Sequence, residues 1–479
     1  MDRRKFLKTS AAAAVAAGVS SLPAWAGKAP KPLGKGKLRL KVGVLSDTHV
    51  HDEKTRARFI KALGWFKERR VDAVLIAGDM TDNGMVPEYK DMAAAWFEVF
   101  PKDQYPDGAR VERLFVYGNH EIEATRYGYI KKKYDAETLK RDAIAPVRER
   151  LWEECWGEPY QPIYMKEVKG YKFIGAQYIN GKTVPGLDDF FRKVEPDLSA
   201  DKPFFYFQYR HPKDTCSAPW VWGQDDGTVT QILARYPNVV AFSGHSHTPL
   251  TDERTVWQGA FTSIGTASLH YIIPIGGREN SKVFGSKEKV PSQMPVLKGG
   301  TAHHGQLMSV YDDCIVLERR EFAYDEHLGT VVIPLGGKGK PWSFEERTQN
   351  EPAPQFAPGA VVRVGELHPG KDRYGASCTQ LDVEFHTAKA HDGLPRPLDY
   401  EVQVEEEGVD VFKAVLTKRV YSNTYFLGQE QDALHPVVCV FSVDELPKDK
   451  RYRFAVRPCN GFGRKGEPIC SPLQEPLQA

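Results

Sequence analysis

The sequence predicts an α/β domain followed by a small all-β domain. From about residue 38 onward, short apolar runs typical of buried strands alternate with segments of helical periodicity. Beyond about residue 360 the pattern changes to short strands of alternating polarity without a convincing helix. The Pro-rich stretch Glu351-Pro352-Ala353-Pro354 lies between the two parts and is typical of a linker. A length of 479 residues suits two or three domains.

The α/β part is predicted from the order of its strands and helices. The expected strands cover residues 40–45, 73–76, 114–117, 171–178, 203–209, 239–242 and 259–264, and a hairpin covers 306–320. The expected helices cover residues 54–69, 92–100, 136–156 and 229–235. In the first helix Phe59, Leu63 and Phe66 share one face, which should pack on the sheet.

The C-terminal part contains five expected strands, at residues 379–385, 398–405, 411–417, 436–442 and 451–458. This pattern predicts a small β-sandwich. We therefore expect a leader over residues 1–26, an α/β domain over 27–345, a linker over 346–359 and a β-sandwich over 360–479.

The first 26 residues have the order of an export signal. A basic start with Arg3 and Arg4 is followed by Phe-Leu-Lys, a small apolar run and Ala24-Trp25-Ala26, which has the form of a cleavage site. This start resembles the bacterial twin-arginine signal, while an ordinary secretory signal and an uncleaved anchor are the alternatives. The resemblance implies the periplasm, the cell envelope or the extracellular space.

Charge and composition narrow the partners. The formal net charge of the chain is +2 and the leader contributes +3, so a mature chain from Gly27 carries about −1. Such a balance argues against a nucleic-acid-binding surface. No apolar run after the leader approaches the roughly 20 residues that cross a bilayer. We expect a small-molecule substrate, with no transmembrane span after the signal.

Seven cysteines are too few and too spread for a disulfide scaffold, and none forms a Cys-x-x-Cys pair. If the chain is exported, a pair such as Cys459 and Cys470 could be oxidised, because that environment permits disulfides. The sequence leaves the pairing open.

Polar motifs lie just past the ends of the predicted strands. In order they are Asp47-Thr48-His49, Gly78-Asp79, Gly118-Asn119-His120-Glu121, His211 and Gly244-His245-Ser246-His247. The carboxyl ends of strands in an α/β sheet meet at one edge, so these residues can gather in one place. Asp, Asn and His are the ligands that hard and borderline divalent metals prefer. Two metals about 3.5–4 Å apart can clamp a phosphate ester. The sequence thus predicts a binuclear metal site.

The five motifs in this order resemble the calcineurin-like metallophosphoesterase family over about residues 38–321. The resemblance implies four layers, with two packed mixed β-sheets between helices. It implies hydrolysis of phosphomonoesters or phosphodiesters by a metal-activated hydroxide, with two divalent ions drawn from Fe, Mn, Zn or Co. The implied roles are a first metal on Asp47, His49 and His247, a bridging Asp79, a second metal on Asn119, His211 and His245, and His120 as proton donor to the leaving group.

Alternatives remain open for activity and substrate. The chain could be a non-catalytic metal-binding scaffold with a glycan- or envelope-binding C-terminal domain. The segment of residues 79–84 is similar to cyclic-nucleotide phosphodiesterases, a weak lean toward diesters. Purple acid phosphatases are disfavoured, because they carry Asp-x-Gly in place of Asp47-Thr48-His49 and a tyrosine after the Gly-Asp motif. Residues 451–463 loosely resemble the end of a fibronectin type III domain, which could pack on the catalytic domain or bind a partner.

Several polar or aromatic residues near the motifs have both a functional and a plain structural interpretation. Glu121 and Asp82 could orient metal ligands or only shape their loops. Arg210 could contact phosphate or lie at the surface. The remaining candidates, which we interpret mainly as loop or packing residues, are His51, Asn83, Trp220, Trp222, His303 and His304.

Overall fold

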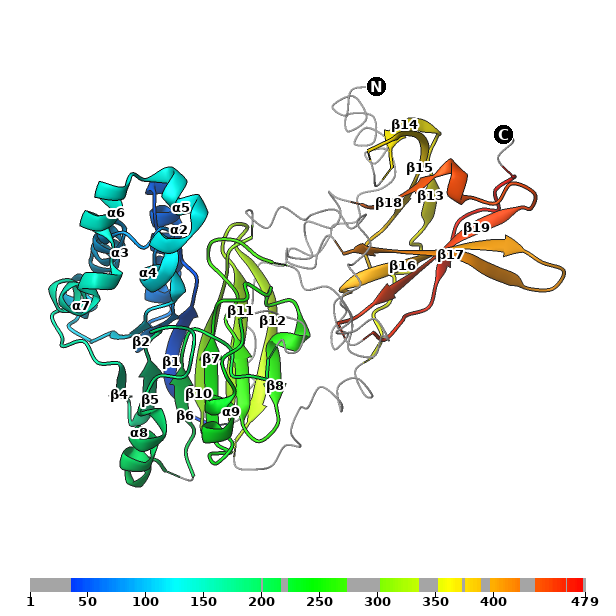
Figure 1. Cartoon of the computed structure of the whole chain (residues 1–479). Coiled ribbons are helices and arrows are strands. Elements are labelled where there is room, and N and C mark those ends of the chain that lie inside the picture. Colours follow the sequence, from blue (N-terminus) through cyan, green and yellow to red (C-terminus); the bar gives the residue numbers. More distant parts are fainter. Residues whose placement is uncertain are drawn as a thin grey trace.

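The computed structural model describes residues 36–199, 201–216, 223–273, 302–335, 352–372, 375–388, 397–422, 436–461 and 463–476. The predicted leader, residues 346–351 of the predicted linker, Trp220 and Trp222 lie outside the described residues. In Figure 1 the blue-to-green elements form the α/β part, and the yellow-to-red strands form a separate all-β part.

The first sheet of the α/β part has six strands in the order β12-β11-β10-β1-β2-β3. Strands β1, β2 and β3 are parallel, whereas β10, β11 and β12 continue from β1 as an antiparallel meander. The strands are β1 (Leu38–Leu45), β2 (Ala73–Ala77), β3 (Glu112–Val116), β10 (His304–Tyr311), β11 (Cys314–Glu321) and β12 (Glu326–Pro334).

The second sheet also has six strands, in the order β4-β5-β6-β7-β9-β8. Its centre β5-β6-β7-β9 is parallel, and β4 and β8 pair antiparallel at the two edges. The strands are β4 (Ile163–Val168), β5 (Tyr171–Ala176), β6 (Phe204–Phe207), β7 (Val239–Ser243), β8 (Val256–Gln258) and β9 (Thr262–Gly265).

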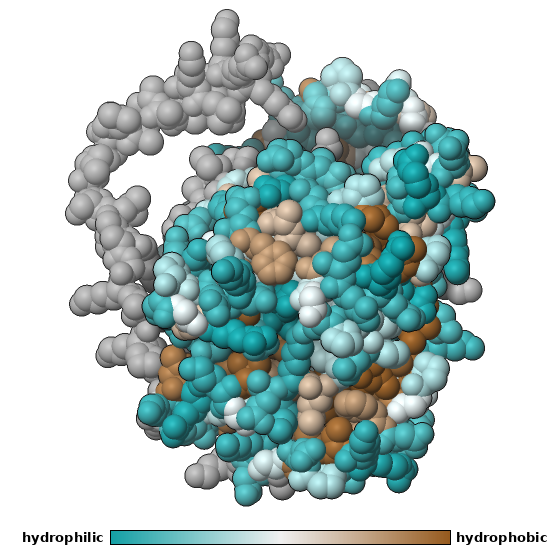
Figure 2. All heavy atoms as spheres, turned by 90° about the vertical axis from the view of Figure 1, so that its left-hand side faces the viewer, coloured by the Kyte–Doolittle hydropathy of each residue, from teal (hydrophilic) through white to brown (hydrophobic). Residues whose placement is uncertain are grey.

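Helices cover the outer face of each sheet. The α-helices are α2 (Glu53–Glu68), α3 (Val86–Val99), α4 (Asn119–Glu123), α5 (Gly128–Lys133), α6 (Ala136–Asp142), α7 (Arg148–Trp156), α8 (Leu187–Val194) and α9 (Thr228–Leu233). Short 3-10 turns are η1 (Pro101–Asp103), η2 (Ala124–Arg126), η3 (Ala145–Val147), η4 (Glu195–Asp197), η5 (Glu253–Thr255) and η9 (Val443–Glu445). The outer surface over the helices that cover the first sheet is mostly hydrophilic, with small hydrophobic patches (Figure 2).

Buried residues show why the sheets and helices stack in layers. Neighbouring strand residues point to opposite faces. Val44 accordingly joins a core between the two sheets, and Leu45 joins the core under α2 and α3. In the second sheet Phe205 faces the first sheet, and Tyr206 packs under α8 and α9. This confirms the predicted mixed sheets flanked by helices.

The prediction of one long helix over residues 136–156 is wrong. The segment divides into α6, η3 and α7, and Ala143 between them is extended, with φ −62° and ψ 134°. Pro146 explains part of the break, since proline has no N–H to donate and disfavours a helical residue before it. The sequence reading also missed β4, β8, β12 and α8.

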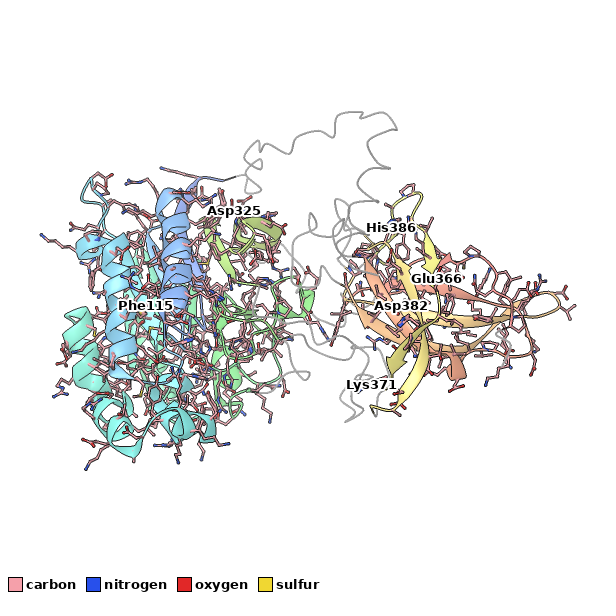
Figure 3. The ribbon with its side chains drawn as sticks, turned by 90° about the horizontal axis from the view of Figure 1, so that it is seen from above. Phe115, Asp325, Glu366, Lys371, Asp382 and His386 are labelled. Atoms are coloured by element: carbon pink, nitrogen blue, oxygen red, sulfur yellow. The ribbon has the colours of Figure 1, made fainter. Side chains whose placement is uncertain are left out.

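The C-terminal part is all-β among its described residues apart from the turn η9. One four-stranded sheet holds β13 (Val362–Val364), β14 (His368–Lys371), β15 (Ser377–Phe385) and β18 (Val437–Ser442). The other holds β16 (Asp399–Glu407), β17 (Phe412–Tyr421), β19 (Tyr452–Cys459) and β20 (Ile469–Cys470). Val383 and Phe441 of the first sheet share one buried cluster with Val402 and Phe454 of the second. Figure 3 shows Glu366, Lys371, Asp382 and His386 on this part, opposite Phe115 in the α/β part. The likeness to fibronectin type III domains stays a prediction.

The two parts touch through a small apolar cluster. Leu250 and Ile272 of the α/β part are buried together with Leu398 and Tyr421 of the all-β part. A Cβ added at Gly461 would lie 3.4 Å from Asp252 Oδ1, so this loop also approaches the α/β part closely. These contacts favour packing as the role of the C-terminal part.

Two further observations bear on the sequence predictions. None of the seven cysteines forms a disulfide, so Cys459 and Cys470 are not joined. Within the described ranges, no helix combines the length and the apolar character that a membrane span requires.

Candidate metal centre

The predicted ligands lie on loops at the carboxyl edges of five strands. Asp47 and His49 follow β1, Asp79 follows β2, and Asn119 begins α4 directly after β3. His211 follows β6, and His245 and His247 follow β7. All seven side chains are buried. Because both sheets present these edges on the same side, residues 200 positions apart in sequence meet there.

Five of these residues have a backbone conformation that non-glycine residues rarely adopt. The φ angles are 49° at Asp47, 46° at His49, 49° at Asp79, 71° at His245 and 52° at His247. Each such residue costs about 1–3 kcal/mol and persists only where the surrounding structure holds it. Strain concentrated at one edge of the sheets is typical of a functional site.

Close contacts between loops explain the glycines in two of the motifs. A Cβ at Gly118 would lie 2.1 Å from Asp79 Oδ1, and a Cβ at Gly78 would lie 2.3 Å from the ring of Tyr209. The backbone N–H of His120 donates to Asp79 Oδ1 at 2.8 Å. Glycine therefore allows the loops after β2 and β3 to approach closely. The loop after β3 then holds the carboxylate of Asp79 on the loop after β2.

The structure gathers the first group of predicted ligands. Possible ligand atoms of Asp47, His49 and His247 all lie within 4.8 Å of one another, and the same holds for His49, Asp79 and His120. His247 Nε2 lies 3.0 Å from Asp47 Oδ1, and His49 Nε2 lies 3.8 Å from Asp79 Oδ2. His120, predicted as the proton donor, therefore stands beside Asp79, the carboxylate predicted to bridge the metals.

Four histidines of the site are held by their Nδ1 atoms. Nδ1 of His49 donates to Asp82 Oδ1 at 3.0 Å, and Nδ1 of His247 donates to the carbonyl of Tyr271 at 2.7 Å. His120 Nδ1 donates to a backbone carbonyl, and His211 Nδ1 bonds to a serine hydroxyl at 2.7 Å. In neutral imidazole, donation from Nδ1 leaves the lone pair of His49, His120 and His247 on Nε2, as in metal-binding histidines whose other nitrogen is fixed by an outer partner.

The second group is less tightly gathered. His211 and His245 do not form a group of the same closeness with Asp79 among the described residues. They do surround the carboxylates: the N–H of His245 donates to Asp47 Oδ2 at 3.0 Å. Burial lowers the pKa of His211 to about 4, although the charge of Asp47 opposes this shift.

Buried side-chain atoms of three predicted ligands, His49 Nε2, Asn119 Oδ1 and His211 Nε2, are without a hydrogen-bond partner. Leaving a buried polar atom unpaired costs about 1–3 kcal/mol, so such atoms call for an explanation. Each is an atom with a lone pair, as a metal ligand requires, and the residues therefore fit a metal centre.

The pKa shifts of the two buried carboxylates also fit a metal centre. Burial and the charges of Asp47 and Glu121 raise the pKa of Asp79 well above its usual value. Burial also opposes ionisation of Asp47, but His247 and His49 bring its pKa down to about 2. A bound cation stabilises carboxylates that are buried close to one another and away from water.

Sequence reasoning missed Tyr209 altogether. Its hydroxyl donates to Asp79 Oδ2 and lies 3.2 Å from Asp47 Oδ1, and its ring centroid lies 4.6 Å from that of His245. An aromatic residue at the end of a buried strand is expected to be core, so the sequence carried no signal for this role. The outer partners Ser243 and Tyr271 were missed for a similar reason, because loop-to-loop contacts depend on the tertiary fold.

Three of the residues with both a functional and a structural interpretation, Glu121, His51 and His304, have defined contacts. Glu121 accepts hydrogen bonds from the backbone N–H groups of Thr81 and Gly118 at 2.7 Å each, and so ties two ligand loops together. His51 donates from Nδ1 to the carbonyl of His49 at 2.8 Å. His304 begins β10 and accepts from the N–H of Leu250 at 3.1 Å, so the prediction of a loop position for it is wrong.

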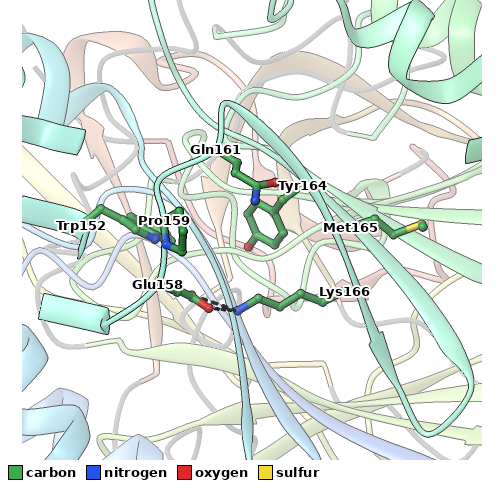
Figure 4. A pocket seen from close by; sticks show the side chains of 7 residues that line it. All are labelled: Trp152, Glu158, Pro159, Gln161, Tyr164, Met165 and Lys166. Carbon is green, nitrogen blue, oxygen red and sulfur yellow. Dashed lines mark hydrogen bonds and ion pairs between the residues drawn. The ribbon is translucent and has the colours of Figure 1, made fainter. Parts of the chain in front are cut away.

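The surface pocket drawn in Figure 4 lies away from these residues. It encloses about 130 Å³ and is lined by residues around Trp152 and the start of β4. Glu158 and Lys166 form an ion pair of 2.8 Å across it, so its charges are already satisfied.

Comparison with known proteins agrees with the site. Residues 40–249 match the family model described as calcineurin-like phosphoesterase, and this stretch contains every strand-end motif. None of the curated proteins gives a significant match. The domain match and the ligand groups support a metal-dependent phosphoesterase.

Solved structures resemble the chain only distantly. A dimetal phosphatase from Danio rerio is 11% identical with a TM-score of 0.36, and covers 63% of this chain and 100% of its own. A purple acid phosphatase from yellow lupin (Lupinus luteus) is 12% identical with a TM-score of 0.41, at 63% and 54% coverage. GAP50 of the Plasmodium inner membrane complex is 14% identical with a TM-score of 0.39, at 63% and 90% coverage. Likenesses this weak carry no argument about activity.

Proposed function

We propose that the chain is an exported hydrolase of small phosphate esters that works with two divalent metal ions. The ions would be Fe, Mn, Zn or Co, and the leader would direct the protein to the periplasm, the cell envelope or the extracellular space. Seven side chains would hold the ions: Asp47, His49, Asp79, Asn119, His211, His245 and His247.

One observation carries the proposal. Buried, unpaired ligand atoms of His49, Asn119 and His211 stand with two buried carboxylates at one edge of the two sheets. A purely structural site would leave these polar atoms unsatisfied at a cost of about 1–3 kcal/mol each. Bound cations would satisfy them and offset the charge of the carboxylates.

The chemistry divides between the cations and the protein. Two bound cations supply Lewis acidity, which eases the ionisation of water and neutralises charge on the phosphate oxygens. The protein positions the ester and moves a proton. Since Nδ1 of His120 donates to the carbonyl of Asp82, Nε2 is the atom that can hold or transfer the proton of the leaving group. Nε2 lies 3.9 Å from Asp79 Oδ2, beside the metal ligands.

Hydrolysis of two chromogenic esters tests this proposal. We would load the chain from Gly27 with Mn²⁺ and assay para-nitrophenyl phosphate and bis-para-nitrophenyl phosphate. Asp79→Asn should abolish turnover, and His120→Asn should slow it by roughly 100-fold or more. His386→Asn, at an exposed position of the all-β part, is the matched control and should behave as wild type.

The outcomes separate the alternatives. Turnover that survives in Asp79→Asn would sink the two-metal proposal. Two bound metals without turnover of either ester would favour the non-catalytic scaffold.

A further inference from the structure

Arg210 is a half-buried cation without an anionic partner. It directly precedes the predicted ligand His211, on the loop after β6. Its Nε is buried without a hydrogen-bond partner, and its terminal nitrogen makes one long contact of 3.4 Å with the carbonyl of Gln224. Among the described residues no carboxylate forms an ion pair with it.

The arginines that are fully buried in the described part of the chain are neutralised. Arg254 pairs with Asp252 at 2.7 Å, Arg113 with Asp103 at 3.2 Å and Arg319 with Glu253 at 3.1 Å. Removing a charge from water is costly unless an opposite charge compensates it. By the same rule Arg210 calls for an anion that comes from outside the chain.

Arg210 lies on the side of the site that holds the predicted second-metal ligands. Its terminal nitrogen contacts the carbonyl of Gln224, and the adjacent Gly223 lies against His245, where a Cβ would be 2.1 Å from the ring. The hydroxyl of Tyr127 accepts a hydrogen bond of 2.5 Å from the amide of Asn119, which leaves its own proton free to donate. A cation and a hydroxyl donor therefore stand next to Asn119 and His245.

The surroundings hold the guanidinium in place. It lies 5.7 Å from the ring centroid of Tyr178. Gly181, with φ +77°, passes so close that a Cβ there would lie 2.9 Å from Arg210 Cζ. A guanidinium held between an aromatic ring and a glycine loses little freedom when it binds an anion.

We propose that Arg210 binds a non-bridging oxygen of the substrate's phosphate and makes the site selective for phosphomonoesters. The inference rests on the proposed phosphoesterase function and deepens it. A monoester carries up to two negative charges and three non-bridging oxygens, whereas a diester carries one charge and two such oxygens. A fixed cation beyond the two metal ions therefore favours the more anionic ester. This contradicts the weak lean toward diesters suggested by residues 79–84.

The test combines anion binding with kinetics on Mn²⁺-loaded protein. Inorganic phosphate is the monoester-like probe and dimethyl phosphate the diester-like probe, each measured by calorimetric titration. Arg210→Met should weaken phosphate binding roughly 10- to 100-fold and dimethyl phosphate binding less than about 3-fold. The same variant should raise KM for para-nitrophenyl phosphate much more than KM for the bis ester. Arg192→Met, on the outer helix α8, is the control and should match wild type.

Arg210→Lys keeps the fold and the charge but loses the planar fork. We expect it to recover phosphate binding in part, and added guanidinium ion to rescue Arg210→Met. Metal content and melting temperature are measured for every variant. If Arg210→Met loses its metals, Arg210→Lys becomes the deciding variant. Unchanged phosphate binding, or equal losses for both probes, would overturn the role. Wild-type protein that binds phosphate through Arg210 but hydrolyses neither ester would refute the proposed function and leave only the anion-binding role of Arg210 standing.

Discussion

Substitution of Asp82 perturbs the metal centre without changing any of the predicted ligands. Its carboxylate accepts the Nδ1 proton of His49 at 3.0 Å, and its backbone carbonyl accepts that of His120. Asp82→Ala removes the side-chain acceptor, so the ring of His49 loses its fixed orientation and tautomer. Loss of such an outer partner typically costs 10- to 100-fold in metal affinity, or about 1.4–2.7 kcal/mol. Asp82→Asn keeps an acceptor oxygen without the charge and should cost less.

Competition with a chelator of known affinity measures the metal affinity of the chain that begins at Gly27 and of its variants. We expect the order wild type, Asp82→Asn, Asp82→Ala in falling affinity for the more weakly bound ion. Asp142→Ala, which breaks an ion pair with Arg141 at the end of α6, is the control and should not change metal affinity. Equal affinity of Asp82→Ala and wild type would refute the reasoning that outer partners preorganise the site.

Three further predictions follow from the same contacts. Tyr209→Phe removes a buried hydrogen bond to two carboxylates and should lower the unfolding free energy of metal-free protein by about 1.5–3 kcal/mol, read by urea denaturation. In metal-free protein, the unfolding free energy of the wild type relative to that of a His211→Asn variant should decrease as the pH falls from 6.5 to about 4. Burial holds the pKa of His211 at about 4 against 6.5 for a free histidine, so the unfolded state binds more protons at this residue in that window; a difference in melting temperature between the two proteins that stays constant across it would contradict this. Gly118→Ala places a Cβ 2.1 Å from Asp79 Oδ1 and should destabilise the fold by roughly 1–3 kcal/mol and reduce metal content, whereas Gly128→Ala, with nothing within 4 Å, should do neither.

The sequence predicted the ligand loops because their positions follow from a general rule of α/β sheets. Asp47, Asp79 and Asn119 come directly after short apolar strands, and parallel strands bring their carboxyl ends to one edge. No knowledge of packing is needed to see that such side chains can meet. The same rule placed His211 and His247 from the second sheet beside them.

The sequence could not show what fixes these ligands. Ser243 and Tyr271 reach the histidines only because the two sheets pack face to face, and Tyr209 resembles an ordinary core residue. Whether Arg210 has a carboxylate partner likewise depends on which acidic residues the fold brings near it. In the fold, the break around Pro146 was missed because apolar residues kept a helical period across it.

Metal stoichiometry tests the central claim most directly. The chain from Gly27 is loaded with Mn²⁺, freed of excess metal and analysed for bound manganese per chain, together with Asp79→Asn. The account predicts two ions per wild-type chain and a clear loss in Asp79→Asn, because Asp79 is the ligand predicted to bridge both ions. A wild-type chain that retains no metal, or that retains two ions equally well without the carboxylate of Asp79, would contradict it.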